Sequence, residues 1–108
     1  MGKNRDRLCI IAAILEATNY GSSKTRIMFS ANLSFKLLEK YLGLVMSAGF
    51  VQVSGSVYLL TESGREFLRL YNDFHERYAK AQEQIEALDS EHAKLAQLCE
   101  NNGFSPFP

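Results

Sequence analysis

The sequence predicts a mainly helical (α+β) fold, in which a small domain of three helices and a β-hairpin precedes one long helix. Apolar residues recur at helical spacing before residue 49, and two short β-type runs flank Gly55-Ser56. Neither Gly nor Pro interrupts residues 65–102. We therefore expect a domain at residues 1–61, a long helix at residues 62–101 and a tail at residues 102–108.

The composition is that of one folded domain with an appendage. Apolar residues make up 46% of the 108 residues and charged residues 22%, which excludes wholesale disorder. The longest apolar run, Leu8–Leu15, falls far short of the ~20 residues that span a bilayer. The highly charged start, residues 1–7, is unlike a secretory signal, so we expect an intracellular protein without a membrane partner.

The first helix is expected to begin near the N-terminus. Asn4 can cap it, and helical spacing of apolar residues continues to about Thr18. The stretch is apolar on nearly every side, which predicts burial of most of its surface, including Cys9. After a turn, either Ser22 or Ser23 can cap a short second helix over residues 24–30.

The third helix is predicted from Ser34 to Ala48. Ser34 is a good N-cap, Leu33 and Leu38 have the spacing of a hydrophobic staple, and Gly49 is the expected terminator. Its inward stripe is predicted to consist of Leu37, Leu38, Tyr41, Leu42, Val45 and Met46.

Residues 50–54 and 57–60 are expected to pair as a hairpin across Gly55-Ser56. Thr61 then caps the long helix, whose first turn contains Glu62. Two short helices joined by a tight turn and followed by a hairpin predict a helix-turn-helix with a wing, that is, a winged helix-turn-helix of three helices plus a β-hairpin wing.

These elements carry motifs that one family shares. In chain order they are Lys24-Thr25-Arg26-Ile27-Met28, Ala31-Asn32-Leu33-Ser34, Tyr41-Leu42, Ala48-Gly49-Phe50-Val51 and Tyr58-Leu59-Leu60-Thr61-Glu62-Ser63-Gly64. They resemble the archaeal winged helix-turn-helix domains, and more closely the small archaeal chromatin-type proteins that carry a C-terminal antiparallel coiled-coil helix. The resemblance covers roughly residues 5–100 and implies a dimer that binds double-stranded DNA with little sequence preference. Family members are typically strongly basic, whereas this chain has a net charge of zero.

Winged helices place the second helix of the helix-turn-helix in the major groove and lay the wing along the backbone or minor groove. The groove-facing candidates are Ser34, Phe35, Lys36 and Lys40. Phe35 can touch a thymine methyl and Lys36 can reach guanine or phosphate, while Ser34 is discounted if capping occupies its hydroxyl. Phosphate contacts are expected from Lys24 and Arg26, and from Lys3, Arg5 or Arg7. The wing offers the small neutral residues Gln52, Ser54, Gly55 and Ser56 as hydrogen-bond donors.

The alternative interpretation of this surface is structural. Lys36 and Lys40 then form a solvated face, and Phe35 packs under a loop. With only about 4–6 phosphate contacts per protomer, DNA binding is expected to be weak and its salt dependence shallow.

The long helix carries an apolar seam that repeats every seven residues. One set is Phe67, Phe74, Ala81, Leu88 and Leu95, and the set offset by four is Tyr71, Tyr78, Ile85, His92 and Cys99. Phe67 and Leu70, at the start, are expected to pack on the chain's own domain. The rest of the seam predicts a homodimer, with a coiled coil formed by two copies.

Charge favours an antiparallel pair. With the two-fold axis near residue 83, Arg77 meets the partner's Glu91 and His75 meets the partner's Asp89, whereas a parallel pair matches no complementary charges. The two winged domains then lie at opposite ends of the coiled coil. His92 has no second ligand at a metal-binding spacing, so a hydrogen bond or stacking on the partner's Phe74 is expected instead of a metal.

Charge also divides along the chain, which hints at a nucleic-acid-binding half. Residues 1–60 carry seven Lys and Arg against three Asp and Glu, and residues 61–108 carry five against nine. The sequence thus predicts a cytoplasmic, nucleoid-associated DNA-binding dimer that acts as a transcription regulator or chromatin architectural protein. The neutral total favours the alternative, a protein-interaction winged helix without DNA binding. No phosphate loop, nucleophile triad or paired carboxylates indicate an enzyme, and nothing indicates a cofactor.

Overall fold

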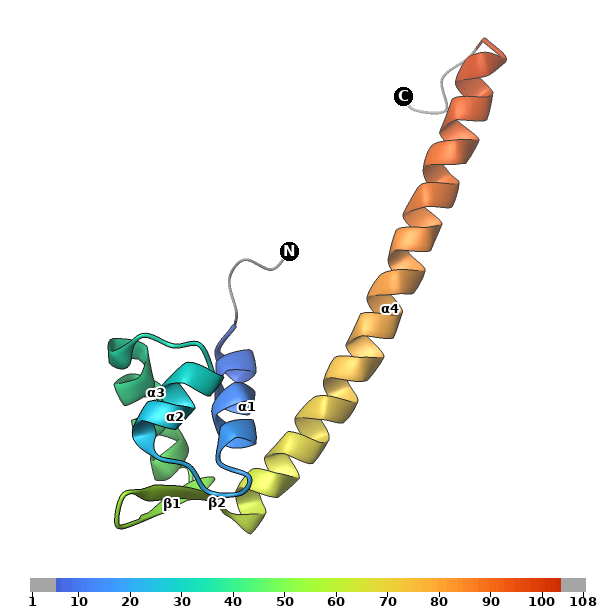
Figure 1. Cartoon of the computed structure of the whole chain (residues 1–108). Helices are drawn as coiled ribbons and strands as arrows, with labels where there is room; N and C mark the ends of the chain where they lie inside the picture. The colour runs from blue at the N-terminus through green and yellow to red at the C-terminus, as the bar shows by residue number, and fades with distance from the viewer. Residues whose placement is uncertain (1–5, 104–108) are drawn as a thin grey trace. The chain divides into compact units, whose positions relative to one another are not determined.

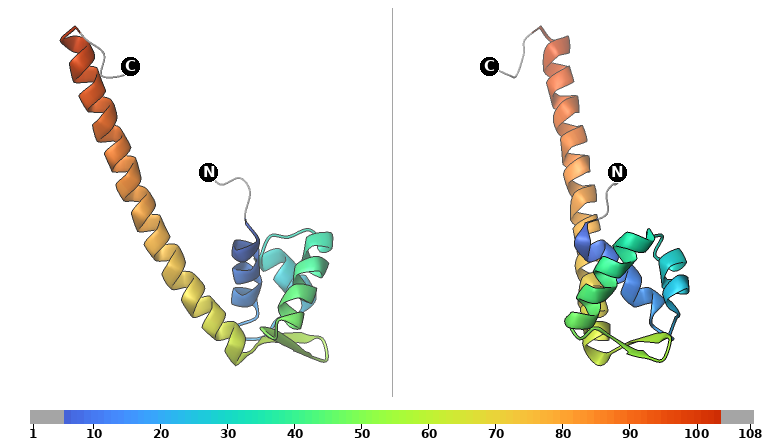
Figure 2. Two further views of the ribbon diagram at one scale, coloured as in Figure 1. Left: turned by 180° about the vertical axis from the view of Figure 1, so that it is seen from behind. Right: turned by 90° about the vertical axis from the view of Figure 1, so that its left-hand side faces the viewer.

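The computed structural model describes residues 6–103 and divides into two compact units, Met1–Asn72 and Asp73–Pro108. The elements, in chain order, are α1 (Arg7–Ala17), α2 (Lys24–Ser30), α3 (Phe35–Ser47), β1 (Val51–Ser54), β2 (Val57–Leu60) and α4 (Glu62–Asn101) (Figure 1). This order confirms the predicted fold of three helices, a hairpin and a long helix. Helices α1, α2 and α3 lie together, with the hairpin at one end of the group (Figure 2).

The first helix begins two residues later than a cap at Asn4 requires, so that predicted cap is wrong. Asp6 caps α1 instead, and its Oδ1 accepts a hydrogen bond of 2.8 Å from the backbone N–H of Cys9. A carboxylate suits this position because the N-terminal end of a helix carries partial positive charge. Asn4 itself lies outside the described residues.

Most of α1 faces the core, as predicted, but Cys9 does not belong to it. Ile14 and Leu15 are fully buried, whereas Cys9 is only half-buried. Cys9 lies in the first turn of α1, where it interacts with the side chain of Tyr71. The predicted core position of Cys9 is therefore wrong.

Serine caps set the beginnings of α2 and α3. Ser23 caps α2 through a 3.2 Å hydrogen bond from the N–H of Arg26, and Ser34 caps α3 through a 3.2 Å bond from the N–H of Leu37. Ser22 has a different role, since its backbone exchanges two hydrogen bonds with Tyr58 of β2, of 3.0 and 2.8 Å. The segment between α1 and α2 is thereby attached to the edge of the hairpin.

The inward face of α3 is narrower than predicted. Leu38, Tyr41, Leu42 and Val45 are buried, but Leu37 and Met46 are exposed by 40% and 38%. At 3.6 residues per turn these two positions lie about 80–100° from the centre of the buried stripe, which places them on its flanks. The other predicted positions of the stripe are confirmed.

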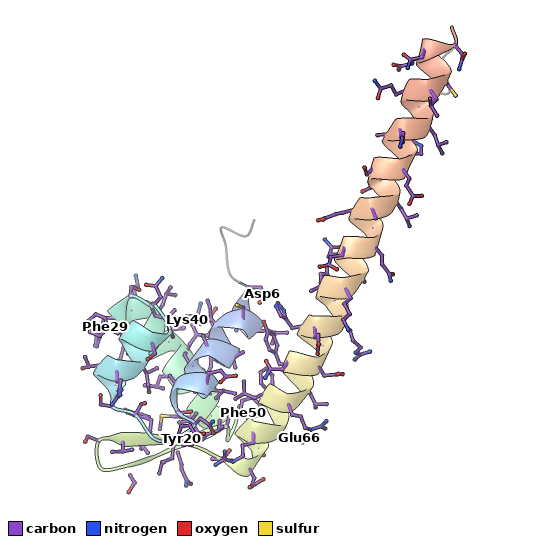
Figure 3. The ribbon with its side chains drawn as sticks, turned by 45° about the vertical axis from the view of Figure 1, so that its right-hand side comes forward. Asp6, Tyr20, Phe29, Lys40, Phe50 and Glu66 are labelled. Carbon is purple, nitrogen blue, oxygen red and sulfur yellow. The ribbon has the colours of Figure 1, made fainter. Side chains whose placement is uncertain are left out.

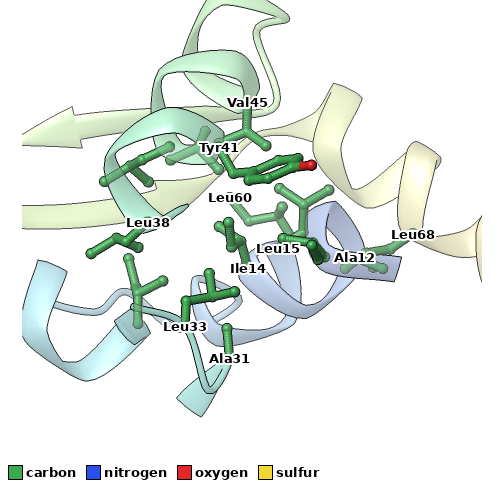
Figure 4. Packing of buried hydrophobic residues seen from close by; sticks show 14 residues of the cluster. Ala12, Ile14, Leu15, Ala31, Leu33, Leu38, Tyr41, Val45, Leu60 and Leu68 are labelled. Atoms are coloured by element: carbon green, nitrogen blue, oxygen red, sulfur yellow. The ribbon is translucent and has the colours of Figure 1, made fainter. Parts of the chain in front are cut away.

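The core of the first unit lies between α1, α3 and the hairpin (Figure 4). Figure 4 shows the ring of Tyr41 beside Val45 and Leu60, with Ile14 and Leu15 of α1 opposite. Val51 and Leu60 are register partners in the antiparallel hairpin and are both buried. Gly49 ends α3 with a φ of +82°, a left-handed conformation that glycine adopts without steric cost.

The first turns of α4 belong to the same packing. Thr61 caps the helix, as predicted, by accepting a 3.1 Å hydrogen bond from the N–H of Gly64, and it donates to the carbonyl of Gly49 at 2.6 Å. Gly64 sits so close to the hairpin that a Cβ would lie 2.3 Å from the carbonyl oxygen of Phe50. Only a residue without a side chain allows this approach.

Three residues of α4 anchor it on this core. Leu68 is buried, the Phe67 ring lies 5.0 Å from the ring of Phe50, and Tyr71 stacks on Phe67 at 6.2 Å. The prediction that Phe67 packs on its own domain is thus confirmed, and Tyr71, predicted for the seam, packs there too. Leu70 is 53% exposed, so its predicted packing is wrong, because Leu68 occupies the inward position.

In the second unit, considered by itself, α4 is a single amphipathic helix. The rings of Phe74 and Tyr78 lie 5.8 Å apart along its apolar side, and Arg77 pairs with Asp73 at 3.2 Å. Asn102-Gly103 follows the helix, as predicted, and Gly103 has a φ of +91°. Residues 104–108 of the predicted tail lie outside the described residues. Within residues 6–103, no helix is both long enough and apolar enough to cross a membrane.

Candidate nucleic-acid interface

The outer face of α3 is positioned by the packing of its inner face. Because Leu38, Leu42 and Val45 are buried, the side chains on the opposite side of the helix must face solvent. The structure accordingly exposes the predicted reading residues Ser34, Phe35, Lys36 and Lys40. Phe35 is 61% exposed, which rules out the interpretation that it packs under a loop.

The capping role of Ser34 is confirmed. Its Oγ accepts the backbone N–H of Leu37, which satisfies one of the unpaired donors at the start of α3. The hydroxyl oxygen of Ser34 is therefore occupied by capping. This is the condition under which Ser34 is discounted as a reader of bases.

Lys24 reaches across from α2 to the outer face of α3. Its Nζ donates a hydrogen bond to Oε2 of Glu39, and the same ammonium lies 5.7 Å from the centroid of the Phe35 ring. The hydrogen bond to Glu39 raises the pKa of Lys24, because it stabilises the charged ammonium. Lys24, Phe35 and Glu39 thus form one surface cluster, which we call the α2–α3 bridge.

Lys40 is also oriented by an aromatic ring. Its Nζ lies 5.5 Å from the centroid of Tyr41, whose own side chain is buried in the core. Figure 3 shows Lys40 on α3, and Phe29, which is 74% exposed, on α2. Lys36 and Lys40 are four residues apart, and therefore one helical turn apart on the same surface.

The hairpin presents the small polar residues predicted for the wing. Gln52, Ser54 and Ser56 are all exposed, and Gly55 makes the turn with a φ of +64°. Val53 and Val57 are about 40% exposed on the same hairpin, so its tip is not purely polar. The wing therefore offers hydrogen-bond donors and apolar surface but no charge.

Of the remaining predicted cations, two lie within the described residues. Arg26 on α2 and Arg7 at the start of α1 are exposed, whereas Lys3 and Arg5 lie outside the described residues. Residues 1–72 carry nine Lys and Arg against five Asp and Glu, and residues 73–108 carry three against seven. The positive charge therefore belongs to the unit that contains the helix-turn-helix.

Sequence reasoning missed the role of Glu39. It is the acidic residue one turn after Phe35 on the same face of α3, and this spacing was the signal available. Its partner Lys24 is 15 residues away in the chain, a contact that no local pattern predicts. Tyr20, 94% exposed in the turn before α2, was also not assigned a role (Figure 3).

The seam predicted on α4 forms a second candidate surface, within the second unit. Phe74, Tyr78, Ile85, Leu88 and Leu95 are each more than half exposed. Ala81 and His92 are exposed as well, and Cys99 is half-buried. Among residues 6–103, no group of three His, Cys, Asp or Glu side chains is arranged to hold a metal ion.

Known proteins are similar to this chain in sequence and in fold. Residues 4–79 match the winged helix-turn-helix family. The chain is 38% identical over 65 residues to the uncharacterized protein MJ0290 of Methanocaldococcus jannaschii, covering 59% of this chain but only 31% of that protein. It is 33% identical over 75 residues to the uncharacterized protein MJ0287 of the same organism, covering 68% of this chain and 74% of that protein.

A solved structure is also similar. The crystal structure of Sso10a-2, a DNA-binding protein from Sulfolobus solfataricus, superimposes with a TM-score of 0.62. The match covers 84% of this chain and 96% of that one at 20% sequence identity. At that identity the similarity concerns the fold.

Proposed function

Because the chain belongs to the winged helix-turn-helix family, we propose that it binds double-stranded DNA. The observation that carries the proposal is the outer face of α3, where Phe35, Lys36 and Lys40 are exposed at the helix that winged helices insert into the major groove. Sso10a-2, a DNA-binding protein with a similar fold, supports the same assignment.

In this proposal the cations have distinct roles. Arg26, Lys36 and Lys40 contact phosphates or base edges, and each contact releases counterions. Gln52, Ser54 and Ser56 donate hydrogen bonds from the wing to the backbone. Lys24 is the exception, since Glu39 already accepts a hydrogen bond from its ammonium group.

The protein acts, in this account, as a homodimer through α4. Phe74, Tyr78, Ile85, Leu88 and Leu95 form an apolar stripe that the second unit cannot bury by itself. An antiparallel pair with its axis near residue 83 sets the bulky aromatic side chains against smaller ones: Phe74 meets the partner's His92, and Tyr78 meets the partner's Leu88. It also brings Arg77 to the partner's Glu91, although surface ion pairs choose orientation more than they supply affinity.

A dimer is important because each domain offers few charges. With about 4–6 phosphate contacts per protomer, a single domain binds weakly, and two linked domains gain affinity through effective concentration. We propose for this dimer a non-enzymatic role as a transcription regulator or a nucleoid-associated architectural protein.

Fluorescence anisotropy with a random-sequence duplex at several salt concentrations tests the proposal. Lys36→Gln/Lys40→Gln is expected to weaken binding and to reduce the slope of log K against log salt by up to about two units per protomer. The matched control is Lys80→Gln/Lys94→Gln, which removes two exposed cations from the second unit and is expected to leave binding unchanged. Absence of binding by the unsubstituted protein at ~100 μM and low salt, or equal effects of both variants, would overturn the proposal.

Two observations favour a second candidate function. The total charge of zero and the exposed rings of Tyr20 and Phe29 suit a winged helix that binds another protein. The anisotropy experiment separates the two functions, because a protein-binding module gives no salt-dependent shift on duplex DNA.

A further inference from the structure

The α2–α3 bridge joins the outer surfaces of the two helices of the helix-turn-helix. Lys24 is the first residue of α2, and Phe35 and Glu39 lie one turn apart at the start of α3. The Lys24 ammonium is hydrogen-bonded to Glu39 and lies 5.7 Å from the Phe35 ring centroid. The side chains of Lys24 and Glu39 remain 40% and 45% exposed.

This pairing makes Lys24 and Glu39 nearly neutral toward an approaching polyanion. A phosphate that bound Lys24 would have to displace the Glu39 carboxylate, and the uncovered carboxylate would then repel the DNA backbone. The pair therefore adds little to the net attraction. Its effect is on geometry, because it keeps a cation beside the Phe35 ring.

Phe35 is an apolar side chain placed where polar ones are usual. It is the first residue of α3 and is 61% exposed, although exposure of a phenyl ring to water is unfavourable. In a helix-turn-helix, residues at the N-terminal end of the second helix contact base edges. The apolar group on base edges in the major groove is the C5-methyl of thymine.

We propose that Phe35 reads pyrimidine C5-methyl groups in the major groove and that Lys24 and Glu39 are positioning residues that hold its ring. This inference rests on the proposed DNA binding and names the feature of the duplex that the site prefers. A protein with this site favours thymine-rich DNA even though none of the three side chains reads a hydrogen-bonding pattern.

Duplexes that differ only in methyl groups test the inference. Fluorescence anisotropy compares an alternating A/T duplex with an alternating A/U duplex, in which the hydrogen-bonding edges are identical and the methyl is absent. Burying one methyl group predicts about fourfold tighter binding of the A/T duplex per contacted methyl. A second pair, alternating G/C with cytosine or with 5-methylcytosine, is expected to show the same preference for the methylated form.

Variants of Phe35 locate the preference. Phe35→Ala is expected to bind the A/T and A/U duplexes equally, while Phe35→Leu, which retains an apolar side chain, keeps most of the discrimination. Both substitutions are at an exposed position, and circular dichroism checks that the variants are folded.

A test of the positioning role requires a double substitution that leaves the net charge unaltered. Lys24→Met/Glu39→Gln removes one charge of each sign, so the salt slope is expected to stay constant while the A/T preference over A/U falls. The control Lys36→Gln is expected to do the reverse, lowering the slope by about one unit and keeping the preference.

The outcomes are distinguishable. Equal binding of A/T and A/U duplexes by the unsubstituted protein, or a preference that persists in Phe35→Ala, overturns this inference and leaves DNA binding standing. An unchanged preference in Lys24→Met/Glu39→Gln overturns the positioning role. Failure to bind any of the four duplexes overturns the proposed function itself.

Discussion

Truncation of Leu88 is expected to weaken the proposed dimer. Leu88 is 62% exposed on the apolar stripe of α4, and full burial of a leucine side chain is worth about 1.5–3 kcal/mol. Scaled by that exposure, each copy loses roughly 1–2 kcal/mol in Leu88→Ala. A two-fold interface contains two copies, so the substitution weakens association by roughly 2–4 kcal/mol, about 30- to 1,000-fold in Kd.

Sedimentation equilibrium of the full chain over a series of concentrations measures this Kd directly. The matched control is Ser90→Ala, two residues further along the same helix, at a heptad position that faces away from the stripe. Both substitutions introduce alanine, the best helix former, so neither weakens the helix itself. An unchanged Kd in Leu88→Ala, or an equal loss in Ser90→Ala, would refute the assignment of the stripe.

The remaining predictions concern the packing of α4 and the pH dependence of stability. Gly64→Ala is expected to lower the free energy of unfolding by about 1–3 kcal/mol, measured by urea denaturation, because its Cβ would collide with the Phe50 carbonyl; a stability equal to that of the original protein would contradict this. Burial, and secondarily Cys9, raises the pKa of Tyr71 above 10.0, so its contribution to stability is complete below pH 10 and is lost as the pH rises through the raised pKa. Tyr71→Phe should therefore flatten the decline of stability above pH 10, and a parallel decline in both proteins would show that Tyr71 is not responsible. The antiparallel register places the two Cys99 residues of a dimer ~48 Å apart, so mild oxidation should yield no dimer linked through Cys99; ready formation of that disulfide would exclude this register.

Local chemistry accounts for what the sequence predicts well. The capping roles of Ser34 and Thr61 and the termination at Gly49 depend on groups only three or four residues apart. The hairpin likewise follows from two β-type runs around Gly55-Ser56. In each case the interacting groups lie within one short segment, so the local sequence pattern is enough to predict the interaction.

Contacts between distant segments account for most of the errors. The width of the buried stripe on α3 depends on the elements that cover it, so the exposure of Leu37 and Met46 could not be predicted from α3 alone. The close approach of Gly64 to Phe50 also joins residues that only the folded chain brings together. The error at the start of α1 has a local cause. Asn4 and Asp6 can both cap a helix, and they lie only two residues apart.

In the candidate site, too, local patterns predict some features, whereas contacts between distant segments are missed. Periodicity along α3 was enough to place Phe35, Lys36 and Lys40 on the outer face, where the structure has them. The pairing of Lys24 with Glu39 joins two helices, and it changes the interpretation of Lys24 from a phosphate contact to a partner of its neighbours. Charge counting along the sequence cannot separate a free cation from one that is already paired.

Chemical-shift perturbation on addition of duplex DNA reports directly whether the outer face of α3 and the wing bind DNA. We expect backbone amide signals of residues 34–40 and 52–57 to move on titration at low salt, while those of residues 80–101 stay in place. Signals that move only outside α3 and the hairpin, or that do not move at all, would contradict this expectation.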